Sequence, residues 1–270
     1  MRKASTKILL RFGIGILVLS VLACGSTPTV PAATSTSSIP PTEAFTPTFT
    51  TMSDFASVSV VSRPTDETVK SPDYTIKAQR PFLQGSEDLR VTNFNDEMNL
   101  LTQEEISKFK DNLGQVRGQP GSAGSTYDQQ YTLLSPPGNL LSLKFQIVTY
   151  MQGAAHPATR IRTVTYNLEA GADVRLAQLF LPGSDYLARI ANFCIAQLKT
   201  RNIGFEDNAS GAQPLPENYG NWNFTTQGLL ITFDQYQVAP GAAGPQEVNV
   251  PYAELSSVID PHGLLAGFLP

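Results

Sequence analysis

Apolar and polar residues alternate most regularly between residues 141 and 147. The apolar positions are Leu141, Leu143, Phe145 and Ile147. Because successive side chains of a strand point to opposite faces, this pattern predicts a strand with one buried face. A loop over residues 152–159 leads to a second strand-like segment, 161–168, which we expect to pair with the first as a hairpin.

Two other segments have the spacing of a helix. In the first, the apolar residues are Phe94, Met98, Leu101, Ile106, Phe109 and Leu113. They predict one long helix that ends before the glycine-rich stretch 114–124. A second helix is expected after Ser184, which could cap it. Its shared apolar face consists of Leu187, Ile190, Ala191, Cys194 and Leu198.

The remaining elements are shorter, with strands expected at 56–63, 73–82 and 228–236 and a helical stretch near 253–259. Hairpins alternate with helices, which favours an α+β fold of antiparallel sheets with packed helices. We expect two subdomains after a signal peptide and a disordered linker. The predicted boundaries are 1–23 for a lipoprotein signal peptide, 24–54 for a Ser/Thr/Pro-rich tether, 55–133 for a small α+β subdomain and 134–270 for a larger α+β domain.

The N-terminus has the pattern of an export signal. Basic residues precede an apolar run at 12–22, which is short of the roughly 20 residues that cross a bilayer and suits a signal peptide. The run ends in Val21-Leu22-Ala23-Cys24, which resembles the bacterial lipobox, where the cysteine receives the lipid. We therefore predict palmitate attachment at Cys24 and an extracytoplasmic chain anchored to a bacterial membrane, with residues 25–53 as the tether.

Composition narrows the class of protein. Of the 270 residues 41% are hydrophobic and 16% charged, with a net charge of -4, which is typical of a folded body. The basic residues are scattered, so we expect no nucleic-acid partner. The two cysteines are Cys24 and Cys194. Since Cys24 lies in the export signal, no disulfide is expected, and Cys194 is predicted to be a core residue rather than a nucleophile.

The larger domain, 134–270, resembles the RsiV-type extracytoplasmic domain family, a domain of unknown function. The matching residues, in order, are Tyr150, Gly153, Ala155, His156, Pro157, Tyr166, Asn167, Leu168, Gly171, Leu176, Ala177, Gln178, Leu179, Phe180, Gly228, Leu229, Phe233, Tyr236, Ala239, Pro240, Gly241, Ala242, Ala243, Gly244, Val250, Pro251, Tyr252 and Leu255. From about Val58, the first part resembles the PdaC-type companion domain that often precedes this one.

The resemblance implies a role at the bacterial wall. One type of member is an anti-sigma factor whose outer domain binds lysozyme, and another carries these domains beside a peptidoglycan deacetylase module. An anti-sigma factor needs a cytoplasmic segment, and cleavage before Cys24 would leave none, so that role is not expected. A deacetylase needs a His/Asp metal set, and the two histidines, His156 and His262, form no paired motif, so we predict no metal or other cofactor.

The candidate ligand-contact residues are Tyr150, His156, Arg160 and Trp222. His156 lies in the expected hairpin loop, with Tyr150 and Arg160 near it in sequence; alternatively, it hydrogen-bonds the backbone and locks the turn. Trp222 belongs to an aromatic cluster that could stack on sugar rings; alternatively, it starts a strand and points into the core.

No catalytic motif stands out, so the chain is predicted not to be an enzyme. Carboxylates are plentiful, but their sequence positions favour no pair: Asp173, Asp185, Glu206, Asp207 and Asp234. The favoured function is a non-enzymatic binding or sensing module for cell-wall glycan or a wall-directed protein such as lysozyme. The alternatives are an enzyme acting on peptidoglycan or its fragments and a domain that docks a membrane partner.

Overall fold

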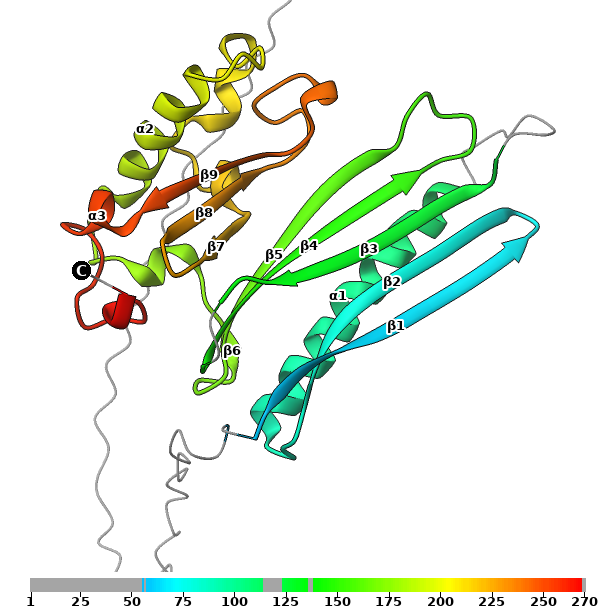
Figure 1. Cartoon of the computed structure of the whole chain (residues 1–270), viewed down its shortest axis with the longest axis horizontal. Helices are drawn as coiled ribbons and strands as arrows, with labels where there is room; N and C mark the ends of the chain where they lie inside the picture. Colours follow the sequence, from blue (N-terminus) through cyan, green and yellow to red (C-terminus); the bar gives the residue numbers. More distant parts are fainter. Residues whose placement is uncertain (1–54, 56, 114–122, 136–137, 269–270) are drawn as a thin grey trace, which may run out of the picture. The chain divides into compact units, whose positions relative to one another are not determined.

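The computed structural model describes residues 55, 57–113, 123–135 and 138–268 (Figure 1). The predicted signal peptide, Cys24 and the tether lie outside the described residues. Among the helices that are described, none is both long and apolar enough to cross a membrane.

The strands are β1 (Ser59–Lys70), β2 (Asp73–Gln84), β3 (Ser125–Leu133), β4 (Leu140–Tyr150), β5 (Ala158–Asn167), β6 (Ala172–Asp173), β7 (Trp222–Phe224), β8 (Gly228–Phe233) and β9 (Gln246–Pro251). The α-helices are α1 (Leu89–Leu113), α2 (Tyr186–Lys199) and α3 (Tyr252–Leu255). Short 3-10 helices are η2 (Leu176–Leu179), η3 (Glu206–Ala212), η4 (Pro216–Tyr219), η5 (Gly241–Ala243) and η6 (Ala266–Phe268).

Strands β1 to β6 form a six-stranded sheet in sequence order. The α+β fold class is confirmed, but β2 and β3 are parallel, whereas the other neighbours in this sheet are antiparallel. Parallel strands need a crossover, and α1 supplies it between β2 and β3. The predicted subdomain boundary, 133/134, falls between β3 and β4, which pair with each other in this sheet.

Helix α1 covers one face of the six-stranded sheet (Figure 1). The helix forms where the apolar spacing predicts one. Its side chains Phe94, Met98 and Phe109 are buried. These side chains belong to two apolar clusters that also contain Phe145 and Ile147 of β4. The buried faces of α1 and β4 thus pack against each other in both clusters.

The second sheet is three-stranded and antiparallel, in the order β7–β8–β9. Cys194 of α2 is fully buried in its core, as the apolar face predicts, and burial raises the pKa of the thiol to about 12. The prediction that Ser184 caps this helix is wrong, because α2 begins at Tyr186 with Asp185 in the N-cap position. The amide of Ser184 instead donates to Leu181 O in the preceding turn.

One buried amide connects the two sheets. Asn223 of β7 is 0% exposed, and its Nδ2 donates to Ser142 Oγ and to Leu143 O of β4, each at 3.0 Å. A buried amide held by two partners fixes the position of β7 against β4, because losing either bond would leave a desolvated polar group.

Candidate functional site

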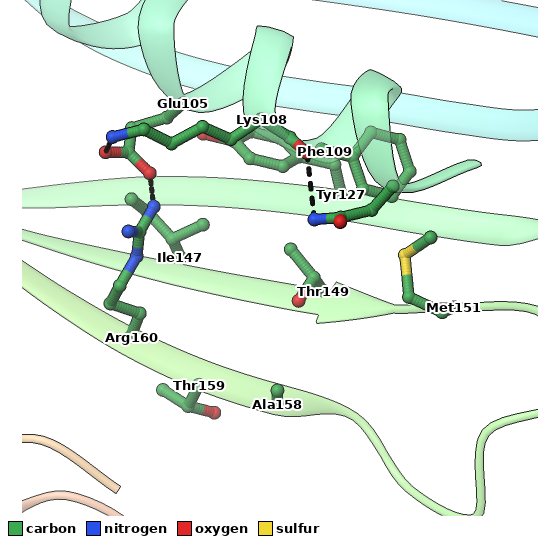
Figure 2. Close-up of a pocket in the computed structure, with 11 residues that line it drawn as sticks. Glu105, Lys108, Phe109, Tyr127, Ile147, Thr149, Met151, Ala158, Thr159 and Arg160 are labelled. Carbon is green, nitrogen blue, oxygen red and sulfur yellow. Dashed lines mark hydrogen bonds and ion pairs between the residues drawn. The ribbon is translucent and has the colours of Figure 1, made fainter. Parts of the chain in front are cut away.

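A cavity of about 400 Å³ lies between α1 and the ends of β3, β4 and β5 (Figure 2). We call it the α1 pocket. Its apolar lining comes from Phe109, Tyr127, Ile147 and Met151. Its charged lining residues are Glu105, Lys108 and Arg160. Cavities of about 300 to 1,000 Å³ with an apolar wall and a few polar groups are typical of small-ligand sites.

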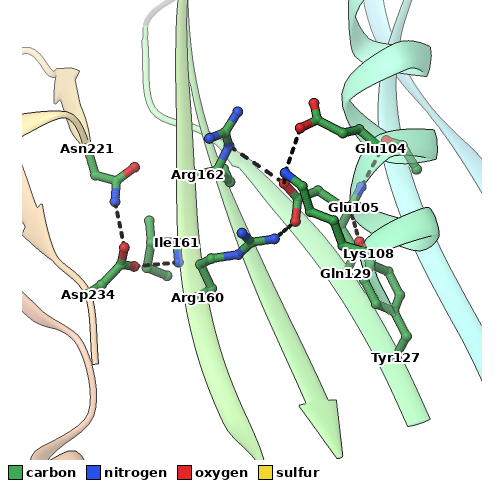
Figure 3. Close-up of polar contacts among 11 residues, drawn as sticks. Glu104, Glu105, Lys108, Tyr127, Gln129, Arg160, Ile161, Arg162, Asn221 and Asp234 are labelled. Carbon is green, nitrogen blue, oxygen red and sulfur yellow. Dashed lines mark hydrogen bonds and ion pairs between the residues drawn. The ribbon is translucent and has the colours of Figure 1, made fainter. Parts of the chain in front are cut away.

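Glu105 is the most buried charged side chain of this pocket, at 1% exposure on α1. It forms an ion pair with Arg160 of β5, and further cations lie at 3.4 Å (Lys108 Nζ to Oε1) and 3.9 Å (Arg162 Nε to Oε1) (Figure 3). A buried carboxylate is tolerated only when such partners compensate its charge.

The electrostatic environment of Arg160 is mixed. Burial and, next, the charge of Arg162 lower the pKa of its guanidinium, whereas the carboxylates of Asp234 and Glu104 raise it. Arg160 therefore lies among charges of both signs. These charges constrain the position of its side chain more than the position of a free surface arginine is constrained.

Neutral polar groups form a buried chain beside Glu105. Tyr127 Oη donates to Gln129 Oε1 at 2.6 Å, and Gln129 Nε2 donates to Thr102 Oγ1 at 3.0 Å. Burial raises the pKa of Tyr127, so its hydroxyl stays protonated. These bonds fix the Tyr127 ring at the wall of the α1 pocket.

A groove follows the outer edge of β5. Along this part of the edge, side chains take the place of a neighbouring strand. Asp234 Oδ1 accepts a hydrogen bond from the amide of Ile161 at 2.8 Å, and Gln235 Oε1 accepts one from the amide of Thr159 at 2.9 Å. Asn221 Nδ2 donates to the other oxygen of Asp234 (Figure 3). Cavities of about 430 and 350 Å³ both include Thr163 and Gly220, so they adjoin as one β5 groove.

Two carboxyl groups meet beside the smaller of these cavities. Glu97 of α1 is half-buried and lies near Asp173 of β6, and we call them the carboxyl pair. Burial, then the hydrogen bond and the charge of Asp173, raise the pKa of Glu97 to about 8. Glu97 therefore keeps its proton near neutral pH. Asp173 also lines the smaller cavity of the β5 groove, together with Tyr186 and Trp222.

The structure does not bring the four predicted contact residues together. Tyr150 is half-buried at the end of β4, and His156 is exposed in the β4–β5 turn with Nδ1 3.0 Å from Pro157 O. Within the described part of the chain, neither Tyr150 nor His156 lines the α1 pocket or either cavity of the β5 groove. Arg160 lines the α1 pocket and the β5 groove, whereas Trp222 is 6% exposed and lines the other end of that groove.

Glu97 and Glu105 are functional candidates that the sequence analysis missed. Glu105 had a detectable signal, because it interrupts the buried stripe of α1. The buried residues of that stripe are Phe94, Met98, Thr102, Glu105 and Phe109. A carboxylate at such a helical spacing indicates a compensated buried charge. Glu97 had no such signal, because only the fold brings it to Asp173.

Within the described residues, no group of three or more His, Cys, Asp or Glu side chains could hold a metal ion. The arrangement can still support chemistry without a metal. The carboxyl pair places a protonated carboxyl, Glu97, near a second carboxyl, Asp173, and positioned carboxyl groups are suited to general acid–base catalysis.

Comparisons with known proteins bear on these sites. Residues 177–253 match the family model described as protein of unknown function (DUF3298). A solved DUF3298-family protein from Bacteroides fragilis superposes with a TM-score of 0.59 at 14% identity, covering 78% of this chain and 96% of that one. One from Pseudomonas aeruginosa gives 0.52 at 12% identity, covering 79% and 96%. These likenesses show a shared fold.

Two curated relatives of the chain carry enzyme names. The peptidoglycan-N-acetylmuramic acid deacetylase PdaC of Bacillus subtilis is 22% identical over 58% of this chain and 34% of its own length. An esterase of Mycobacterium tuberculosis is 28% identical over 50% of this chain and 59% of its own length. The matched region thus spans about a third of the length of the deacetylase and about three fifths of the length of the esterase.

The prediction that the chain is not an enzyme was therefore wrong, because both relatives are named for hydrolytic reactions. Similarity to PdaC is present at low identity. The finer RsiV-type relationship stays a prediction.

Proposed function

We propose that this chain is a hydrolase that removes acyl groups from cell-wall glycan or its fragments, with the carboxyl pair as its acid and base. The observation that carries the proposal is the proximity of the Glu97 and Asp173 carboxyls at the edge of a cavity, where α1 contacts β6. The names of both relatives support it, since a deacetylase and an esterase both cleave an acyl group from nitrogen or oxygen.

The pair suits water-mediated cleavage. Ionised Asp173 accepts a proton from a water molecule, which attacks the acyl carbon. Protonated Glu97 donates its proton to the sugar nitrogen or oxygen as the bond from that atom to the acyl carbon breaks. The products are a carboxylic acid and the free amine or hydroxyl, so atoms balance without a cofactor. Two carboxyls that share one proton perform this division of labour in aspartic proteases.

The β5 groove supplies the binding surface in this proposal. Trp222 and Tyr186 line the same cavity as Asp173. Rings of this kind combine a large apolar face with a polar edge, which suits sugar rings with apolar faces and hydroxyl rims. Trp222 is thus retained as a proposed contact residue.

Acetate release tests the proposed reaction. The full-length chain is incubated with O-acetylated peptidoglycan and, separately, with 4-nitrophenyl acetate. Glu97→Gln and Asp173→Asn should each lower the rate at least about 100-fold. Asp96→Asn, at the neighbouring exposed position of α1, is the control and should keep the wild-type rate. Equal rates in all four proteins, or no acetate release by the wild type, would refute the proposal.

We further propose that the protein acts outside the cell, attached through Cys24 to a bacterial membrane. The lipobox-like sequence and the Ser/Thr/Pro-rich composition of residues 24–54 support this location. Peptidoglycan is the first partner in this proposal, and a wall-directed protein such as lysozyme is the second. Sedimentation of the chain with purified peptidoglycan, compared with a lysozyme affinity column, separates the two partners.

A further inference from the structure

We infer that the α1 pocket is a binding site for a medium-chain carboxylate, separate from the carboxyl pair. The cavity of about 400 Å³ has room for a short alkyl chain. Its wall contains Phe109, Ile147 and Met151, so the chain would replace water against apolar surface.

The charged side chains at the α1 pocket determine which ligand head group fits it. On the α1 side of β5, three cationic side chains surround two carboxylates. The cations are Lys108, Arg160 and Arg162, and the acids are Glu104 and Glu105. Asp234 acts on Arg160 from the β5 groove, where it accepts from the amide of Ile161 and from Asn221. The lining of the α1 pocket itself contains two cations, Lys108 and Arg160, and one carboxylate, Glu105, so the lining carries one surplus positive charge, which complements an anion.

The cations lie at the pocket itself. Lys108 and Arg160 line it, and Figure 2 shows both drawn toward Glu105 at one end of the cavity. The guanidinium has five N–H donors, more than one carboxylate can accept, so Arg160 can contact a ligand while it compensates Glu105. Thr149, also in the lining, adds a hydroxyl. An amphipathic anion thus matches both the wall and the charged end.

Calorimetric titration of the full-length chain with octanoate and with 1-octanol tests the inference. Wild-type protein should bind octanoate saturably and 1-octanol at least about fivefold more weakly. Lys108→Gln should weaken octanoate binding about fivefold and leave 1-octanol unchanged. The matched control is Lys110→Gln on the same helix, since Lys110 pairs with Glu67 and does not line the pocket.

A second pair of variants tests the location. Ala158 is exposed and lines the pocket, whereas Ala155 is exposed in the same hairpin and does not. Ala158→Phe should abolish octanoate binding, and Ala155→Phe should leave it intact, with both proteins melting as the wild type. The inference fails if wild type does not bind octanoate saturably, if both phenylalanine variants bind alike, or if Lys108→Gln and Lys110→Gln have equal effects. Acetate release from the carboxyl pair should be unchanged in all four variants, which separates this inference from the proposed reaction.

Discussion

Glu105 of α1 and Arg160 of β5 form an ion pair in which the carboxylate is 1% exposed and the guanidinium side chain 43% exposed. The pair joins the crossover helix to a strand more than fifty positions later in the sequence. It therefore compensates a buried charge and at the same time fixes one wall of the α1 pocket.

Replacing Arg160 should show how strongly the buried Glu105 carboxylate destabilises the fold when its partner is missing. Arg160→Gln should lower the free energy of unfolding by about 3 kcal/mol, because Glu105 would lose its nearest cation. Urea denaturation followed by circular dichroism measures the change. Arg162→Gln, whose Nε is 3.9 Å from Glu105, is the control and should cost about 0.5 kcal/mol. Adding Glu105→Gln to Arg160→Gln should restore much of the stability; a double variant no more stable than the single one would contradict this account.

Glu97 should make stability depend on pH. Its pKa rises from 4.5 to about 8 in the fold, so its stabilising contribution is complete below pH 4.5 and is lost as pH rises through 8. After allowance for solvent screening, wild type should lose about 1 kcal/mol more than Glu97→Gln between pH 5 and pH 8.5. Urea unfolding of both proteins at the two pH values provides the measurement. Parallel pH profiles would contradict the raised pKa of Glu97.

The start of α1 depends on Asp88. Its Oδ1 accepts the amide of Arg90 at 2.8 Å, and hydrogen bonds from Arg90 lower the pKa of Asp88 to about 2. Asp88→Ala should reduce the free energy of unfolding by about 1 kcal/mol, as expected for a lost helix cap. Thermal melting should show the loss, while Glu87→Ala at the exposed preceding position should melt as wild type. Similar losses in both variants would contradict the capping role.

Asn223 should be essential to the contact between the two sheets. Asn223→Ala removes two hydrogen bonds from a fully buried site and should cost about 2 kcal/mol. Chemical denaturation gives the value, with Asn249→Ala on the exposed side of β9 as the control. A cost below that of the control would mean that packing alone holds β7 against β4.

Lipid attachment should require Cys24. A bacterial host that expresses the chain with an alkyne-labelled palmitate should label the wild type and Cys194→Ser, because Cys194 is buried in α2. Cys24→Ser should carry no label and leave the membrane fraction. Retained label in Cys24→Ser would contradict the lipobox interpretation.

Most elements of the fold could be predicted from local pattern. The alternation around Phe145 and the helical spacing around Phe94 each specify which face is buried, because they match the periods of a strand and a helix. The parallel pairing of β2 with β3 was not predicted, because the strand β3 was itself not among the predicted strands. The Ser184 cap was misplaced by one position, and helix boundaries depend on backbone angles that residue type only biases.

The sequence by itself determined the two long helices, the strands around Phe145, the buried position of Cys194 and the lipobox-like segment around Cys24, because each depends on neighbours along the chain. Only the tertiary structure decided which charges meet. Glu97 joins Asp173, and Glu105 joins Arg160, across separations that no periodicity encodes. The pKa of Glu97 depends on burial and on a partner contributed by another element, so it exists only after the sheet and α1 have packed together.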